Sequence, residues 1–112
     1  MLSRTSRILA LMGKAERQKG LRAELEVRHV FEQAGFTVRS LEGQGDNLVL
    51  CGDGLTLHLE TKRQERIRLP EWARQATIEA PPGAVPVVVW RPSRAEWRAD
   101  LTLTDLLGIL RP

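Results

Sequence analysis

A turn sequence between two alternating segments places the strongest constraint on how this chain can fold. Gly52-Asp53-Gly54 is a strong hairpin signal, and the patterns on either side predict antiparallel strands over Asp46–Cys51 and Leu55–Lys62. Successive side chains of a strand point to opposite faces. The leucines of the second strand therefore share one face, while Glu60 and Lys62 share the other.

The length of the hairpin loop decides which residues stand opposite each other. A three-residue loop, with Gly54 in the left-handed last position, places Asp46 directly opposite Glu60, with Cβ atoms about 4.5–5.5 Å apart. A two-residue loop would instead oppose Asn47 to Glu60 and turn Asp46 to the other face. We favour the three-residue loop, which brings Asp46, Glu60 and Lys62 together on one face of a sheet.

Two neighbouring carboxylates repel each other unless a positive charge neutralises them. A divalent cation does so, and oxygen ligands favour Mg²⁺, with Mn²⁺ as a substitute, over zinc. The spacing of Cys51, His29 and His58 does not fit a zinc site. A metal of this kind activates water and offsets charge on a phosphate, and an adjacent lysine such as Lys62 stabilises the transition state. The pattern therefore predicts phosphodiester chemistry.

The remaining pattern predicts a single domain of the α/β (α+β) class, with one central mixed sheet flanked by helices. Apolar spacing and turn residues indicate eight elements in the order αβββαββα. They are a helix over 20–34, strands over 36–41, 46–51 and 55–62, a helix over 70–79, strands over 85–90 and 96–101, and a final helix through Leu110 capped by Thr102.

Two glutamates of the first expected helix differ in where they point. Glu24 lies at the border of the apolar face and can face the sheet, which makes it a candidate third carboxylate of the site. Glu26 lies about 200° further around the helix and is expected to point to solvent.

Positive charge is concentrated at the N-terminus. Residues 1–23 have a net charge of +5, whereas the remaining residues sum to −2. A basic arm over residues 1–18 fits a polyanion, most simply nucleic acid, although a solubilising tail is the alternative. The candidate DNA contacts are Arg4, Arg7, Lys14, Arg17, Lys19 and Arg22, and Arg63, Arg66 and Arg68 after the acidic strand.

Composition points to a cytoplasmic protein. The single cysteine, Cys51, fits a reducing compartment, and the N-terminus has no continuous apolar segment of the kind found in signal peptides. No apolar run approaches the roughly 20 residues that span a membrane, so no membrane partner is expected.

The segments KGLRAELEV, AGFTVRSLEGQGDNLVLCGDG and LHLETK together resemble the PD-(D/E)XK nuclease superfamily, and within it the archaeal-type Holliday junction resolvases, including phage-encoded relatives. The resemblance implies a restriction-endonuclease-like nuclease domain over 19–112 and a Mg²⁺-dependent homodimer that nicks four-way DNA junctions. It implies metal-binding and catalytic roles for Glu24, Asp46 and Glu60, and a catalytic role for Lys62. If a phage encodes the chain, the location is the host cytoplasm.

Three function classes remain open at this point. The first is a structure-selective endonuclease that resolves four-way or branched DNA by paired symmetric nicks. The second is another endonuclease of the same fold, of restriction or repair type, and the third is an inactive DNA-binding module. Two-fold cutting favours a homodimer. We expect its interface in the C-terminal half, among Val87, Val88, Val89, Trp90, Trp97, Leu103, Leu106, Leu107 and Leu110.

Overall fold

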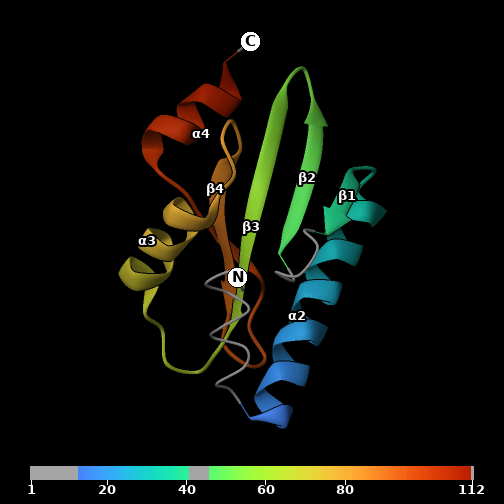
Figure 1. Cartoon of the computed structure of the whole chain (residues 1–112), viewed down its shortest axis with the longest axis vertical. Coiled ribbons are helices and arrows are strands. Elements are labelled where there is room, and N and C mark those ends of the chain that lie inside the picture. Colours follow the sequence, from blue (N-terminus) through green and yellow to red (C-terminus); the bar gives the residue numbers. More distant parts are fainter. Residues whose placement is uncertain (1–12, 41–45, 112) are drawn as a thin grey trace, which may run out of the picture.

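A computed structural model describes residues 13–40 and 46–111 of the chain (Figure 1). The elements follow the expected order αβββαββα, and the expected α+β class is confirmed. They are α2 (Lys14–Gln33), β1 (Thr37–Ser40), β2 (Asn47–Gly52), β3 (Leu55–Arg63), α3 (Leu69–Glu79), β4 (Val85–Arg91), β5 (Arg98–Asp100) and α4 (Leu103–Leu110).

The five strands form one mixed sheet in the order β1-β2-β3-β4-β5. Neighbouring strands are antiparallel except β3 and β4, which are parallel. A parallel pair requires a crossover, and α3 provides it. The chain thus passes directly from the acidic strand β3 into a helix that packs against the same sheet.

The β2–β3 loop differs from the expected one. Gly52 pairs with Leu55, so the loop contains only Asp53 and Gly54. Both residues have positive φ, 53° and 76°, as the type I′ turn of a two-residue hairpin requires. The expectation of a three-residue loop was therefore wrong.

The expected register of the hairpin is nevertheless correct, because a β-bulge compensates for the shorter loop. The ladder shifts between Leu50 and Gly52, which leaves Cys51 as the extra residue of β2. Beyond the bulge Asn47 pairs with Leu59. Continuing this register by one residue places Asp46 opposite Glu60.

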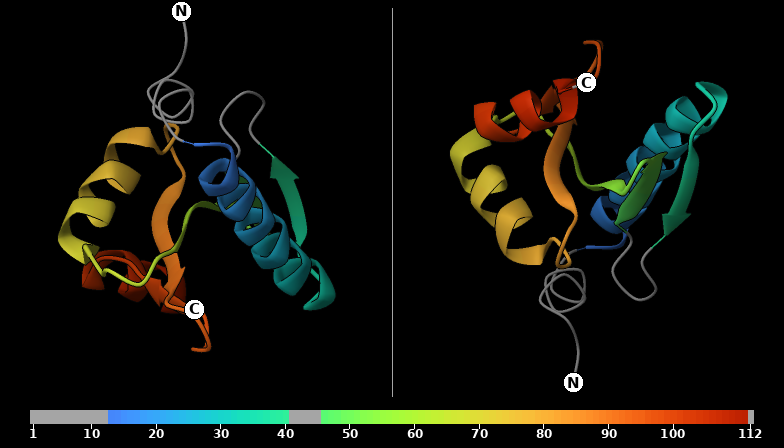
Figure 2. Two further views of the ribbon diagram at one scale, coloured as in Figure 1. Left: turned by 90° about the horizontal axis from the view of Figure 1, so that it is seen from below. Right: turned by 90° about the horizontal axis from the view of Figure 1, so that it is seen from above.

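Helices cover both faces of the sheet, α2 on one face and α3 on the other (Figure 2). Because side chains alternate along β4, its valines pack into the cores on both faces of the sheet. The larger core, beneath α2, contains Val27, Val38, Val49, Leu59, Val87 and Val89. The smaller core, beneath α3, contains Trp72, Ala76 and Val88. The residues Val87–Val89 are thus buried within one chain and cannot form an interface, contrary to expectation.

Helix α2 begins at Lys14, six residues before the expected start, so residues 14–18 of the expected arm belong to this helix. Glu26 is exposed, with 46% of its side chain accessible, as the helical spacing predicted, but it also makes contacts that the sequence did not indicate. Its carboxylate accepts hydrogen bonds from Arg91 Nη2 and Trp97 Nε1, both at 3.0 Å. The Arg91 guanidinium also stacks over the Trp97 ring, 4.7 Å from its centroid. This cluster fixes α2 against β4 and the segment before β5.

Helix α4 starts as expected, with Thr102 Oγ1 accepting a hydrogen bond from the Asp105 backbone N–H at 3.0 Å. No residue of α4 is buried, and four leucines are exposed: Leu103, Leu106, Leu107 and Leu110. Among the described residues, no helix has the length and apolar character needed to cross a membrane.

A pair of leucine substitutions tests the position of the core. Leu59 is fully buried beneath α2, whereas Leu25, on α2, is 52% exposed. We expect Leu59→Ala to lower the free energy of unfolding by about 3 kcal/mol, because it leaves a cavity. Leu25→Ala should lower it by less than about 0.5 kcal/mol. Urea unfolding of the two variants measures the difference, and equal losses would contradict the described packing.

Candidate active site

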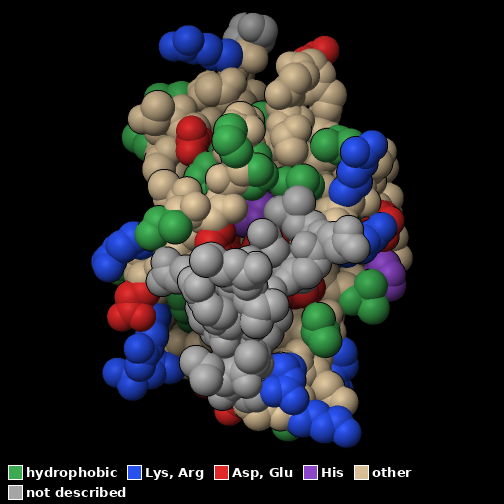
Figure 3. Space-filling view, in the orientation of Figure 1, with side chains coloured by type: hydrophobic (Ala, Val, Ile, Leu, Met, Phe, Trp, Pro, Cys, Tyr) green, Lys and Arg blue, Asp and Glu red, His purple; other side chains and the backbone are tan. Residues whose placement is uncertain are grey.

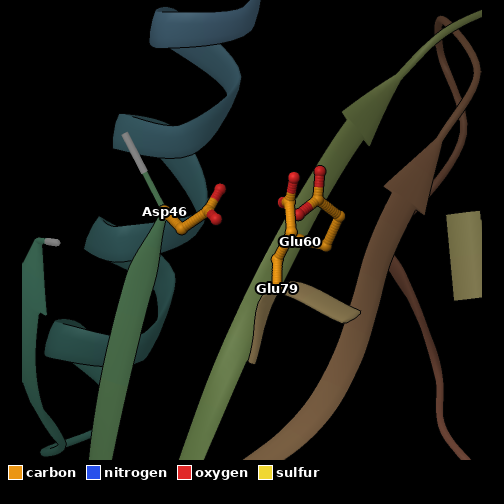
Figure 4. Close-up of side chains that lie close together, drawn as sticks. All are labelled: Asp46, Glu60 and Glu79. Atoms are coloured by element: carbon orange, nitrogen blue, oxygen red, sulfur yellow. The ribbon is translucent and has the colours of Figure 1, made fainter. Parts of the chain in front are cut away.

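Three carboxylates converge where β2 begins beside β3 (Figure 4). Asp46 precedes β2, Glu60 lies within β3, and Glu79 is the last residue of α3. One oxygen from each lies within 4.8 Å of the others. Asp46 and Glu60 are only 3% and 4% exposed. The expected meeting of Asp46 and Glu60 on one face is therefore confirmed, and it occurs in a buried environment rather than on a solvated sheet face.

The charge state of Glu60 reflects this crowding. Burial, the neighbouring Asp46 and a hydrogen-bonded Glu79 raise the pKa of Glu60 to about 8, and only Lys62 acts in the opposite direction. Lys62 Nζ lies 3.4 Å from Glu60 Oε1. Ionised carboxylates only accept hydrogen bonds, so Glu60 and Glu79 can be linked to each other only when one is protonated. With neither protonated, both Glu79 oxygens and Glu60 Oε2 are buried without a hydrogen-bond partner.

Glu24 reaches the same site from α2. Burial and the charge of Asp46 raise the pKa of Glu24 to about 8, and Lys62 counteracts them. Helix α2 is tied to the start of β2 at this point, because Asn47 Nδ2 donates a hydrogen bond of 3.0 Å to the Glu24 backbone carbonyl. The four expected site residues, Glu24, Asp46, Glu60 and Lys62, thus come together, and their roles remain predictions.

His58 lies fully buried beneath Asp46, on the same face of β3 as Glu60. Its Nε2 is 3.1 Å from Asp46 Oδ2, but the two atoms do not have hydrogen-bonding geometry. His58 therefore packs against the carboxylate of Asp46 and restricts its position.

Sequence reasoning missed two residues of the site, Glu79 and the buried Asn47. A signal existed for each. Glu79 follows Trp72 and Ala76 at helical spacing and therefore lies on the face of α3 that packs on the sheet. Asn47 is a poor strand former at the start of a strand, which indicates a specific role for its side chain.

Among the expected DNA-contacting residues, Arg4 and Arg7 lie outside the described part of the chain. The others belong to α2, to the end of β3 and to the loop after it. A hydrogen bond from the Ser93 backbone N–H lowers the pKa of Glu65, and the nearby charges of Lys19, on α2, and Arg63, at the end of β3, lower it further. The first half of α2 and the loop after β3 are therefore neighbours. Figure 3 shows Lys and Arg side chains on both sides of the lower half of the molecule, where these two segments lie.

The donor set fits a hard divalent cation. Asp46 Oδ2, Glu60 Oε2 and both oxygens of Glu79 are buried without a hydrogen-bond partner. Buried carboxylates are stable only when they are protonated, paired or bound to a metal. Sites built from oxygen atoms alone suit Mg²⁺ or Mn²⁺.

The raised pKa values predict an unusual dependence of stability on pH. Because the pKa values of Glu24 and Glu60 lie near 8 in the folded state, against an ordinary 4.5, the folded protein binds more protons than the unfolded chain between these limits. The free energy of unfolding should therefore fall as pH rises from about 5 to 8. The slope is at most about 1.4 kcal/mol per pH unit for each carboxyl, and less for the partly exposed Glu24.

Urea unfolding in EDTA at several pH values measures this slope. We expect Glu60→Gln to flatten it, while Glu32→Gln, an exposed change on α2, should leave it unchanged. Equal slopes in the wild type and Glu60→Gln would contradict the assignment.

No protein-family model and no curated protein matches the sequence. A search of solved structures finds similar chains, among them "Archaeoglobus fulgidus Hjc, a Holliday junction resolvase from an archaeal hyperthermophile". The alignment has a TM-score of 0.60 and 26% sequence identity, and it covers 74% of this chain and 72% of the other. The similarity to archaeal-type Holliday junction resolvases that the sequence indicated is thus confirmed in the structure, and it supports a nuclease.

Proposed function

We propose that the chain is a divalent-metal-dependent, structure-selective endonuclease that resolves four-way DNA junctions by paired symmetric nicks. One observation carries this proposal: Asp46 and Glu60, both buried, stand together on one sheet face with Lys62 beside them. The likeness to the archaeal resolvase supports the choice of substrate.

Asp46 and Glu60 are the ligands we assign to the metal, with Glu24 close by on α2. When bound, Mg²⁺ or Mn²⁺ would lower the pKa of a water molecule and offset charge on the scissile phosphate. Lys62 is only 19% exposed at its side chain, so its charge is less screened than that of a surface lysine. We assign it to stabilising the negative charge that develops on the phosphate. Asn47 and His58 hold the acidic residues in position.

The basic residues around the site are assigned to the DNA backbone. Lys19 on α2 and Arg63 on β3 lie near the loop that carries Arg66 and Arg68, and Arg68 is also 3.6 Å from Glu71. Arg17 and Arg22 lie on the same helix as Lys19. Phosphate contacts of this kind position DNA without reading its sequence, as selection by shape requires. Lys14, Arg4 and Arg7 complete the proposed set.

A homodimer would supply two equivalent sites for the two symmetric cuts. The apolar face of α4 supports an interface between copies. Leu103, Leu107 and Leu110 are 70%, 55% and 67% exposed, and they recur at helical spacing.

Substitutions of the acidic residues test the proposed chemistry. We expect Asp46→Asn, Glu60→Gln and Lys62→Ala to cut a four-way junction at least about 100-fold more slowly in Mg²⁺. Junction affinity in EDTA should remain equal or increase for the two acid variants, because carboxylates repel phosphates. Strand mapping beside a linear duplex of the same sequence provides the measurement.

Asp53→Asn is the matched control for Asp46→Asn, since it makes the same change in a turn that asparagine tolerates. Full cleavage by Asp46→Asn would refute the assigned site. Equal cutting of duplex and junction would favour a general endonuclease, and binding without any cutting would favour a DNA-binding module.

A charged residue on α4 tests the interface. Leu107→Glu should convert a dimer to a monomer, because it places a carboxylate in the apolar face. Ile78→Glu, an equally exposed apolar position on α3, should leave the dimer intact. Sedimentation velocity separates these outcomes, and a monomeric wild type would exclude the proposed assembly.

A further inference from the structure

The end of α3 carries an acidic residue where an apolar one is expected. Trp72 and Ala76 are buried against the sheet, and Glu79 follows on the same helical face. Both carboxylate oxygens of Glu79 are buried, and when Glu79 and Glu60 are both ionised neither oxygen has a hydrogen-bond partner. A buried carboxylate is stable only when it is protonated, paired or bound to a metal, and the groups beside Glu79 are themselves acids.

The neighbours of Glu79 are themselves incompletely satisfied. Asp46 and Glu60 are more than nine-tenths buried, and Asp46 Oδ2 and Glu60 Oε2 have no hydrogen-bond partner, although His58 Nε2 lies 3.1 Å from Asp46 Oδ2. Figure 4 shows the three side chains pointing toward one another from β2, β3 and α3. Lys62 approaches only the other oxygen of Glu60, at 3.4 Å. The single charge of Lys62 does not by itself balance three converging carboxylates.

Glu79 and Glu24 lie at different sides of the acidic pair. Glu24 comes from α2, which covers one face of the sheet, and Glu79 comes from the end of α3, which covers the other. Of these two glutamates, only Glu79 has a carboxylate oxygen within 4.8 Å of an oxygen of Asp46 and an oxygen of Glu60. Within the described part of the chain, Glu79 is thus the better placed third ligand.

We propose that Glu79 is a direct ligand of the divalent cation held by Asp46 and Glu60, so that the ion lies between the sheet and the end of α3. The inference rests on the proposed function in one respect: it takes this ion to be the divalent metal that the proposed nuclease uses for cleavage. Three carboxylate ligands give a hard cation site with strong negative charge, of the oxygen-only kind that Mg²⁺ and Mn²⁺ accept.

The proposal has a structural consequence. Helix α3 ends at Glu79, and Ala80 and Pro81 then lead the chain away. An ion bound to Glu79 would tie this helix end to β2 and β3. Cation binding should therefore stabilise the folded protein as well as support cleavage.

Calorimetric titration of the full chain with Mn²⁺ alone tests the proposal. We expect Glu79→Gln to weaken Mn²⁺ binding roughly tenfold or more, because it removes one charged ligand. Glu71→Gln, a change of the same kind on the exposed side of α3, should bind within about twofold of wild type. In EDTA, Glu79→Gln should melt at the wild-type temperature or higher, since one repelling charge is gone, whereas its stabilisation by Mn²⁺ should shrink.

A second measurement needs no variant. In ¹³C-labelled wild-type protein, traces of Mn²⁺ should broaden the carboxylate resonance of Glu79 and leave that of Glu71 sharp. Wild-type Mn²⁺ affinity in Glu79→Gln, or a sharp Glu79 resonance, would overturn the inference. If Asp46→Asn loses Mn²⁺ while Glu79→Gln does not, the proposed nuclease site stands and this inference fails. If Glu79 binds Mn²⁺ but no junction is cut, this inference stands and the proposed nuclease function fails.

Discussion

The register between β2 and β3 is the constraint on which the rest of the site depends. Asp46 lies one residue before the first β2–β3 pair, Asn47 with Leu59. The register of these pairs therefore sets the face of the sheet to which the Asp46 side chain points. A slip of one residue would turn it toward α2 and separate it from Glu60. The tight turn alone would produce that slip, and the bulge at Cys51 prevents it. One unpaired residue, well away from the acids, thus determines whether they meet.

The site is built at the expense of stability. Asp46 and Glu60 are buried and Glu79 is half-buried beside them, and burial opposes their ionisation. The two cores on either side of the sheet must compensate for this. The hydrogen bond from Asn47 and the contact with His58 hold the acids where repulsion would drive them apart. Such destabilised, fixed arrangements are typical of catalytic centres.

Much of the fold could be predicted from the sequence, because alternation, helical spacing and turn residues are local signals. The position of Asp46 opposite Glu60 followed from their symmetric placement about Asp53, although the turn itself was of another type. A bulge leaves no clear local signal, since it depends on the pairing partner. Glu79 was missed for a related reason. Its helical face was evident, but only the packing of α3 on the sheet brings it to the acids, and that contact is tertiary. The hydrogen bonds of Glu26 with Arg91 and Trp97 were missed for the same reason, because they too are tertiary contacts.

Helix α4 shows how little holds some parts of the chain in place. It has eight residues, a Thr102 cap and no buried side chain. A helix this short is only marginally stable in water without packing. Its order must therefore depend on whatever covers its leucines. If a second copy does so, mass action governs the C-terminus: dilution would melt α4 while the sheet stays folded, and the two events would separate in an unfolding experiment.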